Sequence, residues 1–150
     1  MESSTDGTLR VVIRRRMPAP REVVFEAWID PEGIREWMCP GNATSAEAIL
    51  DVRVGGSFRI VMKAPDKDHV QIGTYQVVDP PSKLVFTWSS AENPTSMTLV
   101  TVEFFAHGDG SELVITHDQF AKTDTAKRYE GGWGTIAEKF AQYLSRKRRR

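Results

Sequence analysis

Residues 124–144 constrain the fold of this chain more than any other stretch, because their apolar side chains repeat with the period of an α-helix. Polar and charged residues occupy the positions between them, which is typical of a helix with one buried face and one solvated face. At about 1.5 Å per residue this helix spans roughly 30 Å, the width of a small domain. Its expected buried face comprises Ala126, Tyr129, Trp133, Ile136, Ala137, Phe140 and Leu144.

Three glycines fall inside this expected helix, at positions 131, 132 and 134. Each costs about 1 kcal/mol of helix stability relative to alanine. They indicate either a kink near Trp133 or a place where another segment approaches the helix backbone. A packing reason is favoured over a catalytic one.

The chain before this helix shows mostly the two-residue period of β-strands. Alternating apolar and polar residues predict strands at residues 9–13, 48–53, 58–62, 71–78, 84–88, 100–104 and 113–116. Two short helices are expected after the first strand, one with Pro20 in its first turn and one N-capped by Asp30. Gly55 and Gly56 predict a tight turn that needs a positive φ or a close approach.

Sequential strands joined by short turns pair antiparallel, and a sheet with one apolar face needs a cover. Only the C-terminal helix is long enough to provide it. The sequence therefore predicts an α+β fold: a curved antiparallel sheet of about six or seven strands wrapped on a long C-terminal helix. We expect one domain over residues 1–150, with a core at about 9–145 and a basic tail at 146–150.

The charge of this chain is unevenly distributed although its formal net value is zero. Residues 146–150 hold five basic and no acidic side chains, so the rest of the chain holds 20 acidic and 15 basic residues. The tail is either a solvated helix end or a contact for an anionic surface, and we favour the former. Because the body is acidic, we expect no nucleic-acid partner.

Cellular location is predicted from three features of the sequence. No apolar run reaches the roughly 20 residues of a membrane span, so no membrane partner is expected. The polar N-terminus resembles neither a signal peptide nor a transit peptide. The single cysteine, Cys39, has no partner for an internal disulfide. Together these features favour a cytoplasmic protein.

A family resemblance appears in residues 19–28, APREVVFEAW, which are followed by Asp30-Pro31 and Trp37. These motifs resemble the opening of the SRPBCC (START/Bet v 1-like) superfamily, and in particular its AHSA1-like domains, named after the activator of Hsp90 ATPase. The similarity covers roughly residues 9–145. Further matching motifs lie at residues 51–58, 73–75, 78–81, 84–88, 112–117 and 131–133.

The resemblance implies a helix-grip fold with a hydrophobic pocket between the sheet and the long helix. Members of the superfamily bind lipids, hormones or polyketides in that pocket, and a few catalyse cyclisation or hydrolysis. Eukaryotic Hsp90 activators carry a separate N-terminal domain with an Asn- and Trp-rich motif, which this chain lacks, so a chaperone partner is not expected. The His, His, carboxylate set of the iron-binding members is also missing.

Residues with reactive side chains are few and scattered. His69, His107 and His117 have no ligand-like spacing, so we expect neither a metal nor another cofactor. Cys39 is interpreted as a small, semi-buried residue, since no nearby base is evident. His117 shares the parity of apolar strand residues, so it either faces the cavity as a hydrogen-bonding group or lies at the surface at the strand end. No catalytic residue is assigned.

Aromatic residues are numerous for so small a core, and they either simply pack or line a pocket for a flat hydrophobic ligand. We expect first a non-enzymatic protein that binds a small hydrophobic molecule. The alternatives are a protein-interaction or co-chaperone-like module, including a homodimer, and an enzyme of the cyclase or hydrolase kind. Candidate cavity residues are Trp28, Trp37, Phe58, Ile60, Tyr75, Phe86, Trp88, Val100, Val102, His117, Trp133 and Phe140.

Overall fold

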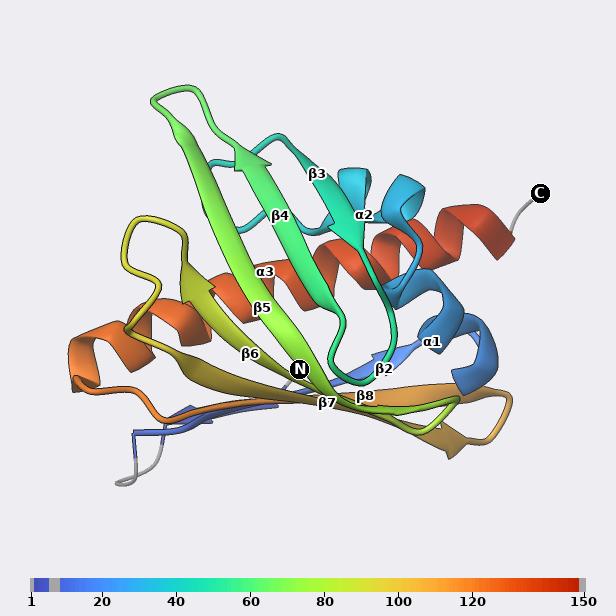
Figure 1. The fold of residues 1–150 in the computed structure, drawn as a ribbon. Coiled ribbons are helices and arrows are strands. Elements are labelled where there is room, and N and C mark those ends of the chain that lie inside the picture. The colour runs from blue at the N-terminus through green and yellow to red at the C-terminus, as the bar shows by residue number, and fades with distance from the viewer. Residues whose placement is uncertain (1, 6–8, 149–150) are drawn as a thin grey trace.

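One antiparallel sheet of eight strands curls around the long C-terminal helix α3 in the computed structural model, which describes residues 2–5 and 9–148 (Figure 1). Two short helices follow the second strand. The elements are β1 (Glu2–Thr5), β2 (Val11–Met17), α1 (Arg21–Trp28), α2 (Pro31–Trp37), β3 (Ser45–Leu50), β4 (Ser57–Lys63), β5 (Asp68–Asp79), β6 (Lys83–Ser90), β7 (Thr98–His107), β8 (Gly110–Asp118) and α3 (Thr123–Arg148).

The strand order is β1-β2-β8-β7-β6-β5-β4-β3, and every neighbouring pair is antiparallel. Strands β3 to β8 form a meander joined by short turns, whereas β2 returns to pair with β8, with Val11 opposite His117. This confirms the predicted α+β fold. β1 was not predicted, because a strand at the sheet edge can form through backbone hydrogen bonds without alternating apolar residues.

Strand β3 lies earlier in the chain than expected, at Ser45–Leu50 instead of residues 48–53. The reason is a turn that begins at Asp51, whose backbone oxygen accepts from the amide of Arg53. The two glycines are needed as predicted: Gly55 has a φ of +85°, and a Cβ on Gly56 would lie 2.0 Å from the Asp51 carbonyl oxygen.

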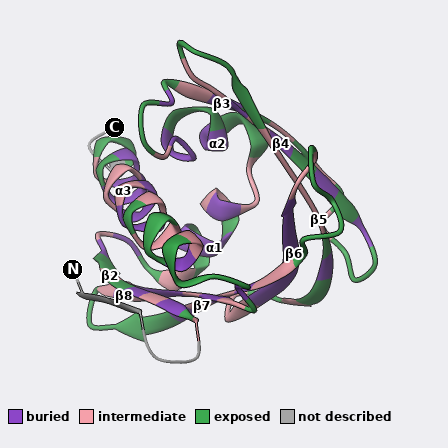
Figure 2. Cartoon of the chain, turned by 90° about the vertical axis from the view of Figure 1, so that its left-hand side faces the viewer, coloured by how far each residue is buried: buried purple, intermediate pink, exposed green. Residues whose placement is uncertain are grey.

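The concave face of the sheet carries the core and grips α3, as the view along that helix shows (Figure 2). Helix α3 runs without interruption from Thr123 to Arg148 and so includes the first part of the basic tail. Of the helix glycines, Gly132 faces another segment, since an added Cβ would lie 3.6 Å from Pro40 Cβ, whereas a Cβ on Gly131 would meet open space. The expected buried face is confirmed, with six residues buried and Tyr129 packed at its margin.

Helices α1 and α2 close one end of the concave face and bring two indoles to α3. The Trp28 and Trp37 rings lie 5.0 Å apart, and the Trp37 ring lies 4.2 Å from that of Phe140 on α3. Asp30 caps α2 as predicted, with its carboxylate accepting from the Glu32 amide at 3.1 Å. These contacts fix the short helices over the space where a ligand pocket was expected.

Candidate functional site

The space between the sheet and the helices is nearly filled by side chains, so the hydrophobic cavity predicted from the sequence is not shown by this structure. The remaining void has a volume of about 10 Å³, roughly the space of one water molecule. Pockets for small organic ligands usually measure about 300 Å³ or more. The void is lined by Trp28, Ile34, Met38, Leu50, Phe58, Ile60, Tyr75, Phe86 and Trp88.

Polar atoms at this void are few, and one of them has no partner. The indole Nε1 of Trp88 is buried without a hydrogen-bond acceptor among the described residues. Tyr75 adds a phenol, and burial, together with the nearby charge of Asp51, raises its pKa to about 12. The phenol therefore stays neutral at physiological pH and keeps its O–H donor. The void is thus largely apolar, and its lining residues include Trp88, whose indole N–H is unpaired.

The structure divides the twelve predicted cavity residues into two groups. Six line the void: Trp28, Phe58, Ile60, Tyr75, Phe86 and Trp88. The other six lie in the core without lining it: Trp37, Val100, Val102, His117, Trp133 and Phe140. Sequence reasoning did not include Ile34, Met38 and Leu50, although each is an apolar residue at or near the end of a predicted element.

His117 is fully buried and forms hydrogen bonds through both ring nitrogens. Its Nδ1 accepts from the indole N–H of Trp133 at 2.8 Å. Since an indole only donates, Nε2 carries the ring proton and donates to Thr98 Oγ1 at 2.6 Å. Thr98 in turn donates to the carbonyl oxygen of Trp88 at 2.8 Å. His117 therefore links α3 to β7 and β6, and its surroundings are structural.

The charge state of His117 follows from this environment. Burial lowers its pKa to about 3, so the imidazole is neutral at physiological pH. Protonation would also place a new N–H on Nδ1 directly against the Trp133 donor.

Cys39 is also buried, and burial raises the pKa of its thiol despite the nearby Lys139 ammonium. A protonated thiol agrees with the interpretation of Cys39 as a small packed residue.

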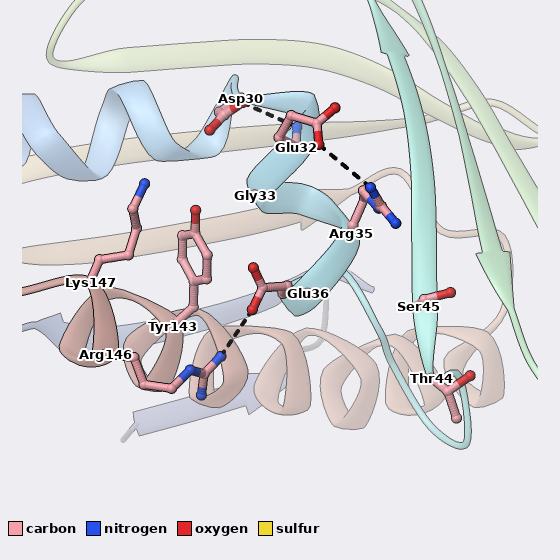
Figure 3. A pocket seen from close by; sticks show the side chains of 10 residues that line it. All are labelled: Asp30, Glu32, Gly33, Arg35, Glu36, Thr44, Ser45, Tyr143, Arg146 and Lys147. Atoms are coloured by element: carbon pink, nitrogen blue, oxygen red, sulfur yellow. Dashed lines mark hydrogen bonds and ion pairs between the residues drawn. The ribbon is translucent and has the colours of Figure 1, made fainter. Parts of the chain in front are cut away.

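Two larger hollows lie on the outer surface around the C-terminal turns of α3. The α2 hollow, of about 710 Å³, lies at the surface beside α2, the start of β3 and the end of α3 (Figure 3). Its lining is Asp30, Glu32, Gly33, Arg35, Glu36, Thr44, Ser45, Tyr143, Arg146 and Lys147. The α1 hollow, of about 490 Å³, is lined by Glu22, Val23, Glu26, Ala27, Asp30, Leu144 and Lys147.

Ion pairs neutralise much of the α2 hollow. Arg35 lies 3.5 Å from a Glu32 oxygen, and Arg146 lies 3.6 Å from a Glu36 oxygen (Figure 3). Tyr143 is only 5% exposed, and the Lys147 ammonium lies 5.5 Å from the centre of its ring. A Cβ on residue 33 would lie 2.6 Å from the Tyr143 hydroxyl oxygen, so Gly33 leaves the space that the phenol occupies.

Within residues 2–5 and 9–148, no group of three or more His, Cys, Asp or Glu side chains is placed to hold a metal ion. No helix in the described part of the chain has both the length and the apolar character needed to span a bilayer.

An eight-stranded sheet that grips a long C-terminal helix, with two short helices at one end, defines a helix-grip α+β domain. The family described as "Activator of Hsp90 ATPase homolog 1-like protein" matches residues 18–145. The chain therefore belongs to this AHSA1-like family of the SRPBCC superfamily.

Solved structures with the same fold come from several bacteria. Protein Ms6760 from Mycobacterium smegmatis has a TM-score of 0.83 at 18% identity, covering 98% of this chain and 98% of that one. Protein NE0264 from Nitrosomonas europaea has a TM-score of 0.81 at 20% identity, covering 97% and 99%. A putative uncharacterized protein from Rhizobium leguminosarum has a TM-score of 0.72 at 28% identity, covering 97% and 96%. A comparison with curated proteins finds no match.

Proposed function

We propose that this protein is a non-enzymatic binder of a small, flat, apolar molecule that carries one hydrogen-bond acceptor. The observation that carries the proposal is the buried, unpaired indole N–H of Trp88, a residue that lines the aromatic void between the sheet and the helices. A buried donor without a partner costs about 1–3 kcal/mol, and an acceptor on a bound molecule would remove that cost. The aromatic walls would supply stacking and edge contacts to a flat ring.

Binding requires the void to open, because its present volume is about 10 Å³. The side chains best suited to move are Met38, at the end of α2, and Leu50, at the end of β3. Methionine has three rotatable bonds and adapts to irregular spaces, while Leu50 is only partly buried. We propose that a ligand enters by displacing these two side chains between α2 and β3.

The enzyme alternative gains no specific observation from this site. Among the described residues that line the void, Tyr75 is the only titratable one, and its raised pKa makes it a poor base. His117 lies outside the lining, with both nitrogens already in hydrogen bonds. A binding role needs only the apolar walls and a hydrogen-bond donor.

The test is native mass spectrometry of the protein as purified from its own cells, compared with the same sample after denaturation. We expect an excess mass that denaturation releases. Trp88→Phe, which keeps an aromatic wall but removes the N–H donor, should reduce the occupied fraction several-fold. Trp37→Phe is the matched control, because the Trp37 indole N–H is also buried and unpaired but does not line the void.

Two results would contradict the proposal. If the native mass equals the mass of the chain alone, and added 1-anilinonaphthalene-8-sulfonate shows no fluorescence change that depends on Trp88, the void is merely a packing defect. Equal loss of bound mass in both tryptophan variants would indicate a general effect on folding and would also reject the assigned site.

A further inference from the structure

A second surface of the molecule combines an exposed valine, Val23, with a row of three carboxylates. The α1 and α2 hollows share Asp30 and Lys147, so they adjoin one another along the last turns of α3. We call the two together the α3 groove. We propose that the α3 groove binds a short amphipathic peptide segment of a partner protein, with an apolar row facing α1 and basic side chains beside it. This site is separate from the aromatic void.

The apolar part of the groove lies over α1 and α3. Val23 is 48% exposed, and it lines the α1 hollow together with Ala27 and Leu144. Val23 and Ala27 are four residues apart, so they form one row along α1. Such a row matches the spacing of apolar side chains on an amphipathic helix laid into a groove.

The charged part runs parallel to that row. Glu22, Glu26 and Asp30 recur every four residues, and all three line the α1 hollow. Glu22 has only a 4.0 Å contact with Arg21, whose guanidinium also donates towards Ser82 Oγ and the Phe104 carbonyl oxygen. These three carboxylates face one ammonium in the lining, that of Lys147, which leaves an excess of two negative charges.

The acidic row is unfavourable for α1 itself. Like charges at Glu22 and Glu26 repel each other by about 0.2–0.5 kcal/mol at this spacing. Glu26 also lies in the last turn of α1, near the negative end of the helix dipole, and that turn holds no basic residue. Positive charges from a partner would relieve both effects, which favours a basic segment as the occupant.

A second observation points to an occupant from the α2 side of the groove. Tyr143 is nine-tenths buried, yet its hydroxyl faces the α2 hollow without a partner among the described residues (Figure 3). Of the six charged residues that line this hollow, four are paired as Arg35–Glu32 and Arg146–Glu36, and the Lys147 ammonium lies 5.5 Å from the centre of the Tyr143 ring. The free hydroxyl is therefore available to hydrogen bond with the backbone of a bound segment.

The experiment measures binding of the full chain to a fluorescein-labelled synthetic helical peptide with one leucine face and one lysine face. Fluorescence anisotropy is read at low and at high salt. We expect binding that weakens with salt. Glu22→Gln/Glu26→Gln should weaken the affinity about fivefold to tenfold, since two exposed ion pairs are removed. Both positions are exposed, so the variant should keep its fold, which circular dichroism checks.

The matched control is Glu47→Gln/Glu92→Gln, which removes the same charge from exposed sites outside the groove. It should leave the affinity unchanged. Equal weakening by both double variants would show diffuse attraction and overturn the proposal. So would equal binding of a peptide with glutamine in place of lysine.

Two further readouts complete the test. Tyr143→Phe should weaken the peptide about twofold to threefold, and an unchanged affinity would overturn the role of the hydroxyl. Sedimentation velocity of the protein alone should show no dimer that Glu22→Gln/Glu26→Gln dissociates. Such a dimer would mean that a second copy occupies the groove, which would overturn the assignment to a partner peptide.

Discussion

His117 is the residue whose role depends most on its surroundings. From the sequence it was either a polar group in a cavity or a surface residue at the end of a strand. The structure places it in the core, where Trp133 and Thr98 occupy its two nitrogens. Both partners are remote in sequence, so no local pattern could identify them.

This environment makes stability depend on pH in a defined window. The unfolded chain protonates His117 near its ordinary value of 6.5, whereas the folded chain does so only near 3. The contribution of the neutral histidine is fully present above 6.5 and is lost as the pH falls towards 3. The free energy of unfolding should therefore decrease by at most about 1.4 kcal/mol per pH unit from this one proton.

Urea denaturation followed by tryptophan fluorescence measures this dependence. His117→Gln is the control, because glutamine does not titrate, and its curve should be shallower between these two pH values. If the wild-type chain and His117→Gln lose stability with the same slope, other groups carry the pH dependence and the assigned pKa is wrong.

At the scale of elements, glycines that look alike in the sequence lie in different structural environments. Gly73 lies where β5 approaches β6, and an added Cβ would meet the Thr87 carbonyl oxygen at 1.9 Å and the Phe58 ring at 2.5 Å. Gly131 lies on the exposed side of α3, where the same atom would meet nothing. The sequence indicated either a kink or a close approach for the helix glycines, and the structure supplies neither at Gly131.

Substitution by alanine should separate these two cases. Gly131→Ala should raise the free energy of unfolding by about 0.5–1 kcal/mol, since alanine is the better helix former. Gly73→Ala should lower it by several kcal/mol, or prevent folding, because backbone and a buried ring must move. Thermal denaturation by circular dichroism checks both. A destabilised Gly131→Ala would show that α3 needs flexibility at that point.

At the scale of the whole molecule, α3 holds the sheet and both short helices in one core cluster. Phe140 illustrates this, because its ring contacts Trp28 of α1 at 5.6 Å and Trp37 of α2 at 4.2 Å. An ion pair of 2.9 Å between Arg15 and Glu138 joins the same helix to β2. With one shared core, the described elements should lose their structure together.

Phe140→Ala should therefore lower the free energy of unfolding by about 3–5 kcal/mol, the usual cost of deleting a buried phenylalanine. Far-UV circular dichroism and tryptophan fluorescence should shift together in urea, because helix and sheet unfold in one transition. If the helix signal is lost before the fluorescence changes, α3 and the sheet are separate cooperative units.

The sequence by itself determined the fold and the elements that build it. Apolar residues recur about every 3.6 residues in α3 and every two residues in the strands, which distinguishes the two kinds of element. Short turns between successive strands require antiparallel pairing. These signals are local, so they survive without any knowledge of distant contacts. Half of the predicted site residues also line the observed void, because strand parity and helix face decide which side chains turn inward.

Only the tertiary structure decided how completely that interior is filled. The void at the expected pocket measures about 10 Å³, and its lining includes Met38 and Leu50, which come from separate elements. The α3 groove likewise forms only where α1, α2 and the end of α3 meet. The volume between elements depends on their separation and side-chain rotamers, and these follow from the closure of the whole sheet on α3.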